Sequence, residues 1–325
     1  METKKKALYN TLRLNWLANP ELKVHPWQVE DLRSVDSEEL LQRIALLGVK
    51  MDPAQFMALA EEYETPEDLS EELFSEHEPE EADEGFLAVF ELWRRWLPEK
   101  TTLSLFCDEL DYQIQLYDHE GSLNLEALND AIARLLQILN ENVDAGLLPE
   151  KCMESLEVFS ANDIKQFLYD YFSQEIDDGN LAWARDMIEG FIPFLSSSPW
   201  FKLLEIKIKA EEGKEDLEPR VKALLKEGEK ESLDFQMEIL DFLTRFGDES
   251  LFSAALKKAL PLAENEEDLY DLIQLAADFF HFLDDEDREK RVLELSEGRN
   301  FMSDKELKED DRMILAFKSI VFGPR

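Results

Sequence analysis

The sequence predicts an all-α protein, and three observations lead to this fold class. Leucine occurs 52 times, whereas the β-branched residues Val, Ile and Thr together occur 30 times, a balance that favours helices over strands. Apolar residues recur at three- and four-residue spacing, and no segment shows the alternating pattern of a half-buried strand. Helix starts are marked by dipeptides in which an N-cap side chain precedes a proline: Asp52-Pro53, Thr65-Pro66 and Ser198-Pro199.

The apolar spacing then predicts each element in turn. In the first half of the chain we expect helices near 5–18, 37–48, 53–63, 66–75, 86–97, 101–117, 125–143 and 150–159. In the second half we expect helices near 162–177, 181–195, 199–211, 217–227, 232–246, 249–262, 266–283, 287–296 and 304–319. Ser303 and Glu306 predict a capping box at the start of the last helix, in which each side chain accepts from the other residue's backbone N–H.

The charge of the chain excludes some partners. The 325 residues include 35 Lys and Arg against 74 Asp and Glu, a formal net charge of −39. Phosphate backbones and anionic lipid surfaces are bound by Lys and Arg, so direct binding to nucleic acid or to a membrane surface is disfavoured. No apolar run is long enough to span a bilayer and the N-terminus lacks a signal-peptide core, so we expect a cytoplasmic protein.

The negative charge is concentrated in one stretch. Residues 51–93 carry 15 acids and neither Lys nor Arg, and the densest part is interrupted by Pro79 and Gly85. Because like charges repel and Pro and Gly interrupt helices, residues 77–85 are predicted to form an exposed acidic linker. The linker is either a solvated tether or a docking strip for a basic segment. The first 33 residues, by contrast, carry six Lys and Arg against four acids, and this end could lie against the protein's own acidic surface.

A 34-residue period runs through the second half of the chain. Three glycines are spaced 34 residues apart where helices are expected to end: Gly179, Gly213 and Gly247. Two series of apolar residues have the same spacing. The first is Phe167, Phe201, Phe235 and Leu269, and the second is Phe172, Ile206 and Leu240. Each unit therefore reads helix, turn, helix, over 163–195, 199–227, 232–263 and 266–295. Such units bury their apolar faces only against their neighbours, so the period predicts an α–α superhelix with a concave groove.

The period, the two-helix unit and the glycine between helices resemble the tetratricopeptide class of helical repeats, over about residues 125–297. The family has a small residue in its first helix where this chain carries bulky ones such as Tyr171, Phe172 and Leu240. Tetratricopeptide arrays generally bind peptides or extended segments of other proteins, and the resemblance implies the same here. We expect four parts: an N-terminal helical region (1–76), the acidic linker (77–85), the repeat array (86–298) and a C-terminal capping helix (299–325).

The motifs that would indicate chemistry are missing from the sequence. The four histidines are scattered, and neither a zinc-binding pattern nor a Gly-rich phosphate loop, a nucleophile elbow or a CxxC pair occurs. The segment from Asp118 to Leu123 imitates part of a calcium loop, but Leu116 and Ala127 stand at its two end ligand positions. Cys107 and Cys152 lack an adjacent histidine and are expected to be buried. We therefore expect no catalytic residue, no cofactor and no metal.

These observations favour a non-enzymatic scaffold or chaperone-like adaptor that binds a basic or amphipathic segment of a partner protein. Aromatic side chains at helical spacing are the candidate contacts, because aromatic residues are enriched at binding hot spots: Phe90, Trp93, Tyr171 and Trp183. The same aromatic stripes are also typical of a core. Two alternatives remain, an enzyme with dispersed carboxylates on a helical array and an acidic mimic of nucleic acid.

Overall fold

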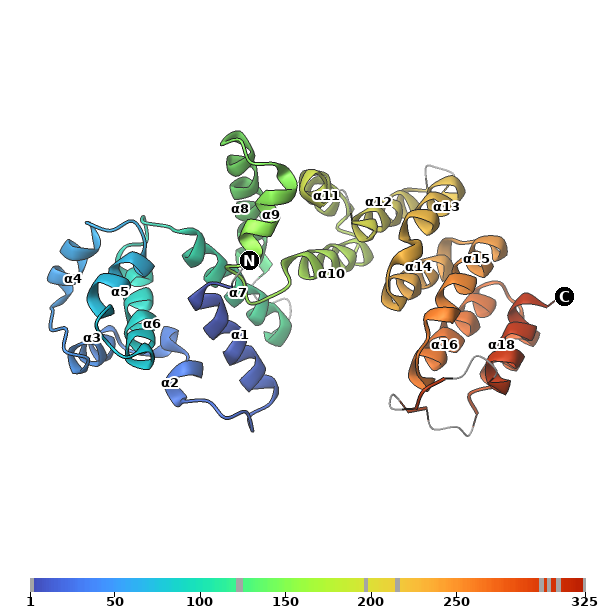
Figure 1. The fold of residues 1–325 in the computed structure, drawn as a ribbon. Coiled ribbons are helices and arrows are strands. Elements are labelled where there is room, and N and C mark those ends of the chain that lie inside the picture. Colours follow the sequence, from blue (N-terminus) through green and yellow to red (C-terminus); the bar gives the residue numbers. More distant parts are fainter. Residues whose placement is uncertain are drawn as a thin grey trace. The chain divides into compact units, whose positions relative to one another are not determined.

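The computed structural model describes residues 3–120, 125–195, 198–213, 217–297, 301–302, 305–307 and 311–323 (Figure 1). Over these residues the protein is all-α, which confirms the predicted fold class. The only extended pairing among them is a single bridge between Asn265 and Glu306. The chain forms two compact units, residues 1–168 and 169–325, and each is described by itself.

Unit 1 is built from helices and one short 3-10 turn, η1 (Leu32–Ser34). Its helices are α1 (Lys5–Ala18), α2 (Pro26–Val29), α3 (Ser37–Leu46), α4 (Pro53–Ala60), α5 (Pro66–Phe74), α6 (Pro79–Trp96), α7 (Leu103–Glu120), α8 (Leu125–Asp144) and α9 (Pro149–Glu157). The next helix, α10 (Ile164–Asp177), continues into unit 2.

Two of the three predicted cap-and-proline helix starts have the expected hydrogen bonds. The Asp52 carboxylate accepts from the Gln55 backbone N–H at 2.9 Å, and the Thr65 hydroxyl accepts from that of Asp68 at 3.1 Å. The third helix begins at Pro199 as predicted, but Ser198 makes no side-chain cap. The predicted capping box at Ser303 lies outside the described residues.

Helix α6 is the centre of the core of unit 1. Helices α3 and α5 pack against it, and residues 85–93 of α6 are all buried. The largest of these side chains, Trp93, is fully buried, and its indole N–H donates to the Lys100 carbonyl oxygen at 3.2 Å. An aromatic stripe at helical spacing is thus the inner face of a core helix.

The acidic linker predicted over residues 77–85 is wrong, because α6 begins at Pro79. Proline at the first position of a helix costs no hydrogen bond, and Glu80 and Glu81 fall in the first turn, where the helix dipole favours acids. Gly85 lies within the helix, and the ring of Phe74 of α5 occupies the space that a Cβ would fill there. The domain boundary expected there falls inside α6, and the division between the two compact units lies at 168/169 instead.

Replacing Gly85 by alanine tests this helical packing. A Cβ at this position would lie 2.5 Å from the Phe74 ring, so the overpacking, at about 1–3 kcal/mol, should outweigh the helix propensity gained, at most about 1 kcal/mol. We expect Gly85→Ala to lower the free energy of unfolding in urea. The control is Glu81→Ala, at an exposed position of the same helix. A Gly85→Ala variant with the same free energy of unfolding as the wild type would contradict the contact with Phe74.

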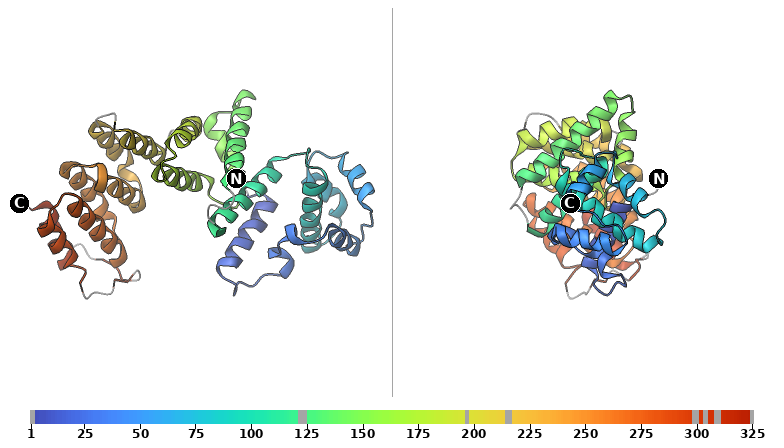
Figure 2. Two further views of the ribbon diagram at one scale, coloured as in Figure 1. Left: turned by 180° about the vertical axis from the view of Figure 1, so that it is seen from behind. Right: turned by 90° about the vertical axis from the view of Figure 1, so that its left-hand side faces the viewer.

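Unit 2 contains the rest of the chain. Its remaining helices are α11 (Leu181–Leu195), α12 (Pro199–Glu212), α13 (Glu218–Glu227), α14 (Leu233–Phe246), α15 (Glu249–Ala259), α16 (Glu266–Phe282), α17 (Glu286–Leu293) and α18 (Arg312–Phe322), with 3-10 turns η3 (Gly228–Lys230) and η4 (Leu260–Leu262). The first helices of successive pairs pack together, since α14 contacts both α12 and α16, while α13 contacts α15 (Figures 1 and 2).

The predicted periodic turns are present, although they do not share one conformation. Gly179 and Gly213 follow the first helices of their pairs with φ of 84° and 62°, a left-handed conformation that favours glycine. Gly247 follows α14 with φ of −97°, so it does not adopt this left-handed conformation. Of the periodic apolar residues on these first helices, Phe201, Phe235 and Leu269 are all buried.

The C-terminal capping helix is shorter than predicted. It begins at Arg312, not near residue 304, and packs against α16 and α17 (Figure 2). Its buried face consists of Met313, Ile314, Phe317, Ile320 and Val321. This contact covers apolar surface at the end of the array, as a terminal helix is expected to do.

Candidate functional site

Three of the four aromatic residues predicted to contact a partner are buried. Trp93 and Phe90 lie in the core of unit 1, and Tyr171 on α10 is 1% exposed. In this structure none of the three has an exposed face with which to contact a partner, and Phe90 is covered by Lys6 of the N-terminal helix α1. Trp183 on α11 is half-buried and packs edge-on against Tyr171, with ring centroids 5.7 Å apart. The helical spacing of these aromatic residues therefore reflects their packing in the core.

A polar site of unit 1 lies instead beneath the N-terminal helix. Consecutive lysines of α1 reach carboxylates of α6 and α7: Lys5 Nζ lies 2.6 Å from Asp83 and Lys6 Nζ lies 3.0 Å from Asp108. The Tyr9 hydroxyl donates to Asp83 at 2.7 Å. The expectation that the basic N-terminus lies against the protein's own acidic surface is therefore confirmed for α1.

Aromatic rings complete this contact. Lys5 Nζ lies 5.4 Å from the centroid of the Phe86 ring, and Lys6 Nζ lies 5.4 Å from that of Phe90. Lys4 lies over the Phe159 ring at 5.7 Å, and its backbone N–H donates to the Val158 carbonyl oxygen. Cations over aromatic faces are attracted by the ring quadrupole. Each of the three lysines therefore lies over an aromatic ring, and Lys5 and Lys6 are also paired with a carboxylate.

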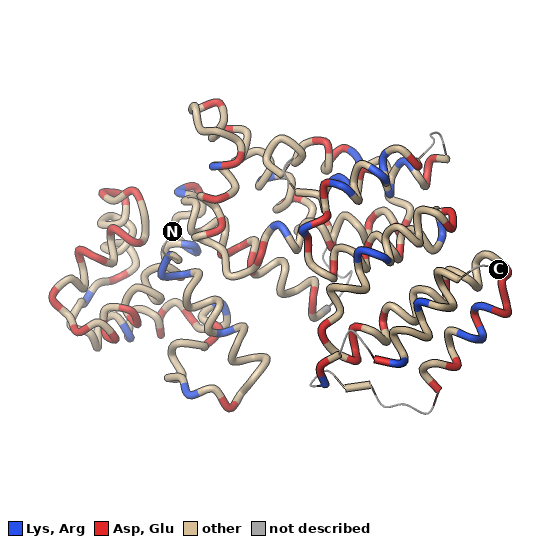
Figure 3. Tube along the Cα trace, turned by 45° about the vertical axis from the view of Figure 1, so that its right-hand side comes forward, with Lys and Arg blue, Asp and Glu red and all other residues tan. Residues whose placement is uncertain are grey.

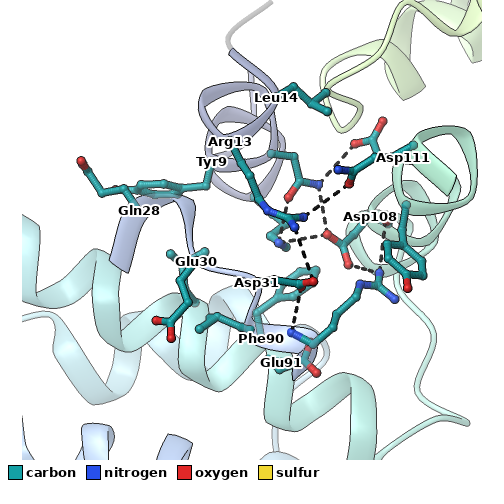
Figure 4. Close-up of a pocket in the computed structure, with 17 residues that line it drawn as sticks. Tyr9, Arg13, Leu14, Gln28, Glu30, Asp31, Phe90, Glu91, Asp108 and Asp111 are labelled. Carbon is teal, nitrogen blue, oxygen red and sulfur yellow. Dashed lines mark hydrogen bonds and ion pairs between the residues drawn. The ribbon is translucent and has the colours of Figure 1, made fainter. Parts of the chain in front are cut away.

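Asp108 is a buried carboxylate of the site (Figure 4). It accepts from Arg33 at 2.7 Å and from the Asn10 amide at 3.0 Å, in addition to its ion pair with Lys6. Burial acts to raise the pKa of Asp108, but the positive charges of Lys6 and Arg33 hold it below its usual range. The carboxylate is therefore ionised and paired on more than one side.

Asp111, one turn further along α7, is held by a loop. It accepts from the Ser160 hydroxyl at 2.6 Å, from the Ala161 backbone N–H at 2.8 Å and from the Asn162 amide at 2.8 Å. Burial raises the pKa of Asp111, although these hydrogen bonds act in the opposite direction. The Asn10 amide also donates to Asp111 at 3.3 Å, so one side chain of α1 bridges both buried carboxylates.

Arg33 joins the connecting segment before α3 to the same site. Its guanidinium binds Asp108 and Glu109, each at 2.7 Å, and lies 4.1 Å from the centroid of the Tyr112 ring. Burial acts to lower the pKa of Arg33, but Asp108 and Glu109 raise it more. The arginine is consequently a fixed positive charge.

The space enclosed by these residues is too small for a substrate. The cavity between α1, α6 and α7 has a volume of about 60 Å³, whereas ligand pockets measure roughly 300–1,000 Å³. Both buried carboxylates are already hydrogen-bonded within the protein, so neither is available as a general base. Among the described residues, no group of three or more His, Cys, Asp or Glu could hold a metal ion.

Unit 2 has a buried polar cluster on the first helices of three successive pairs. Lys207 of α12 lies 2.5 Å from Glu238 of α14 and 2.9 Å from the hydroxyl of Ser173 of α10. The Tyr169 hydroxyl donates to the same Glu238 at 2.9 Å. Burial and the nearby charge of Glu238 both raise the pKa of Tyr169. A serine beside a lysine is a possible nucleophile and base, but here the lysine is engaged in an ion pair with Glu238.

A signal for this second cluster was present in the sequence. Ser173 and Lys207 are 34 residues apart, the spacing already seen in the apolar series, although Glu238 follows Lys207 by 31 residues. Polar residues at one repeat position on packed first helices lie near one another in space. The three-dimensional role of Asp108 and Asp111 had no such signal, because their partners come from segments about 50 to 100 residues away.

Residues 51–78, which include α4 and α5, carry Asp and Glu but neither Lys nor Arg (Figure 3). Within the described part of the chain, no helix combines the length and the apolar composition needed to cross a bilayer. No family model, no curated protein and no solved structure matches this chain.

Proposed function

We propose that this protein is a non-enzymatic interaction protein, a scaffold or chaperone-like adaptor, that binds a basic amphipathic helix of a partner protein. The observation that carries the proposal is the way unit 1 binds its own α1. The α1-binding surface comprises three carboxylates and three aromatic rings: Asp83, Asp108, Asp111, Phe86, Phe90 and Phe159. A partner helix with lysines at adjacent positions could use the same chemistry.

The attachment of α1 supports exchange with such a helix. Only Ala7 and Tyr9 of α1 are buried, and the ion pair of Lys5 with Asp83 lies at a partly exposed position, whereas Lys6 reaches the buried Asp108. Partly exposed ion pairs contribute little each and weaken with salt. The connection to α2, residues 19–25, is largely exposed, so α1 is tied to the rest of unit 1 by a short surface segment.

An exchange experiment tests the proposal. A protease site placed within residues 19–25 of the full chain would be cut after folding, leaving α1 bound without a covalent link. A fluorescent peptide of residues 3–18, added in excess, should then replace α1, and its affinity should fall roughly tenfold between low and high salt because its charges are screened. Fluorescence anisotropy measures both.

Two peptides serve as controls. A designed helix that keeps only the three lysines and the tyrosine of α1 at their spacing, on an alanine background, should also bind, because those residues carry the contacts. A peptide with the three lysines changed to glutamate should not bind. Equal binding of the lysine and glutamate peptides, or failure of any peptide to enter the cut protein, would rule out this surface as a site for basic helices.

A further inference from the structure

A second opening in unit 1 differs from the site beneath α1 in size and in charge. The α6–α8 groove runs between the end of α6, the start of α7 and the outer side of α8, and its volume is about 550 Å³. Its apolar lining includes Leu97, Phe106 and Ile138, and its charged residues are Arg94, Arg134 and Glu109. The volume falls within the range of roughly 300–1,000 Å³ typical of ligand pockets.

The charges at the groove favour an anion. The lining carries two arginines and one glutamate, in a chain whose net charge is −39. Glu109 is ion-paired with Arg33 at 2.7 Å and also accepts from Gln113. Arg94 shares Glu91 with Arg95, at 2.5 Å and 2.6 Å, so one carboxylate faces two guanidinium groups.

Arg134 on α8 is the cation best placed to change partners. Its side chain is 43% exposed and pairs with Glu141 at 3.2 Å, and Glu141 is itself 54% exposed. An exposed ion pair of this kind contributes about 0–1 kcal/mol, so an incoming carboxylate can compete with Glu141 at little cost. Arginine also presents five N–H donors, which suit a carboxylate in a two-point contact.

From this combination we propose that the α6–α8 groove binds a long-chain carboxylate. The acyl chain lies against Leu97, Phe106 and Ile138, and the carboxylate is received by Arg134 and Arg94. Burial of the acyl chain contributes to the affinity through the hydrophobic effect, and the two arginines favour an anionic head group. A neutral chain of the same length would lack the ionic contact, and a cationic one would be repelled. This inference is independent of the proposed function, because the groove shares no residue with the α1-binding surface.

Calorimetric titration of the full chain with three ligands of equal chain length tests the groove: dodecanoate, dodecanol and dodecyltrimethylammonium. We expect dodecanoate to bind one to one and about tenfold more tightly than dodecanol, a factor that corresponds to about 1.4 kcal/mol. The ammonium ligand should bind most weakly. Equal affinity for the three ligands, or no saturable binding of dodecanoate, would overturn the proposal.

Two variants locate the binding. Arg134→Gln should remove most of the preference for dodecanoate over dodecanol, whereas Arg245→Gln in unit 2, another exposed arginine in an ion pair with a carboxylate, should not. Ile138→Trp should fill the groove and lower the affinity for both ligands by about tenfold, while Leu315→Trp, at an exposed apolar position of α18, should have no effect. Unchanged binding by Ile138→Trp would place the ligand elsewhere. Both groove variants should leave exchange at the α1-binding surface intact, which separates failure of this inference from failure of the proposed function.

Discussion

Replacing Asp108 by alanine is expected to cost about 3–5 kcal/mol of the free energy of unfolding of unit 1, because removing one partner from a buried ionic cluster leaves the others unpaired. Arg33 and Lys6 would lose the carboxylate that each of them contacts, and Asn10 would lose an acceptor. Denaturation in urea, followed by tryptophan fluorescence, measures the loss. We also expect α1 to detach before the rest of unit 1 unfolds.

The matched control is Glu39→Ala, which removes a carboxylate from an exposed ion pair with Arg43 on the surface of α3. Exposed pairs contribute about 0–1 kcal/mol, so this variant should be close to wild type. If the two variants lost similar amounts, the α1 site would be an ordinary surface cluster and the enclosed position of Asp108 would have no energetic consequence.

The cost of the Asp108 substitution should depend on pH. Because the folded-state pKa of Asp108 is lower than its unfolded value, the ionised carboxylate stabilises the fold above the unfolded value of about 3.9. This stabilisation is lost as pH falls through the lower folded-state pKa. The difference between wild type and Asp108→Asn should therefore be constant from pH 5 to 7 and shrink progressively at more acidic pH. A difference that grew on acidification would contradict the pairing.

The second large effect is expected in unit 2, at the ion pair between the buried Lys207 and the partly buried Glu238. Changing Glu238 to alanine should cost about 3 kcal/mol, because Lys207, whose side chain is 10% exposed, is left without its counter-charge. Tyr169 would also lose its acceptor. The thermal or urea unfolding of the full chain, followed by the fluorescence of the tryptophans in unit 2, measures this loss.

The double variant Lys207→Met with Glu238→Leu is the informative comparison. Replacing both members of a buried ion pair by apolar residues of similar size is often neutral, since both desolvation costs disappear together. We expect the double variant to be more stable than Glu238→Ala alone. A double variant as unstable as the single one would mean that Lys207 and Glu238 do not act as a pair.

The helices of this protein were largely predictable, because local patterns determine them. The Asp52-Pro53 and Thr65-Pro66 dipeptides begin helices because a side-chain cap and a proline satisfy the first turn without distant contacts. The linker around Gly85 was predicted wrongly for a related reason. A glycine in an acidic run is typical of a break, whereas here the ring of Phe74 from α5 packs where a Cβ would lie, a contact that only the folded structure shows.

The candidate site was predictable only in outline. The excess of lysine and arginine near the N-terminus indicated self-contact with an acidic surface, which is what α1 does. The residues that receive it were not indicated, since Asp83 and Asp108 are two among 74 acids. The aromatic candidates failed because burial and binding produce the same helical spacing of Phe and Trp, and exposure distinguishes them only after folding.

By itself, the sequence determined that this protein is helical, strongly acidic with a basic start, and built in its second half from helix pairs about 34 residues long. These features depend on neighbours within a few turns, or on composition, and both can be read along the chain. The tertiary structure alone decided that Asp108 and Asp111 are enclosed beneath α1, that Lys207 faces Glu238, and that Arg134 borders an apolar groove. Those arrangements depend on which helices pack together, because the charge and reactivity of a side chain are set by what surrounds it in space.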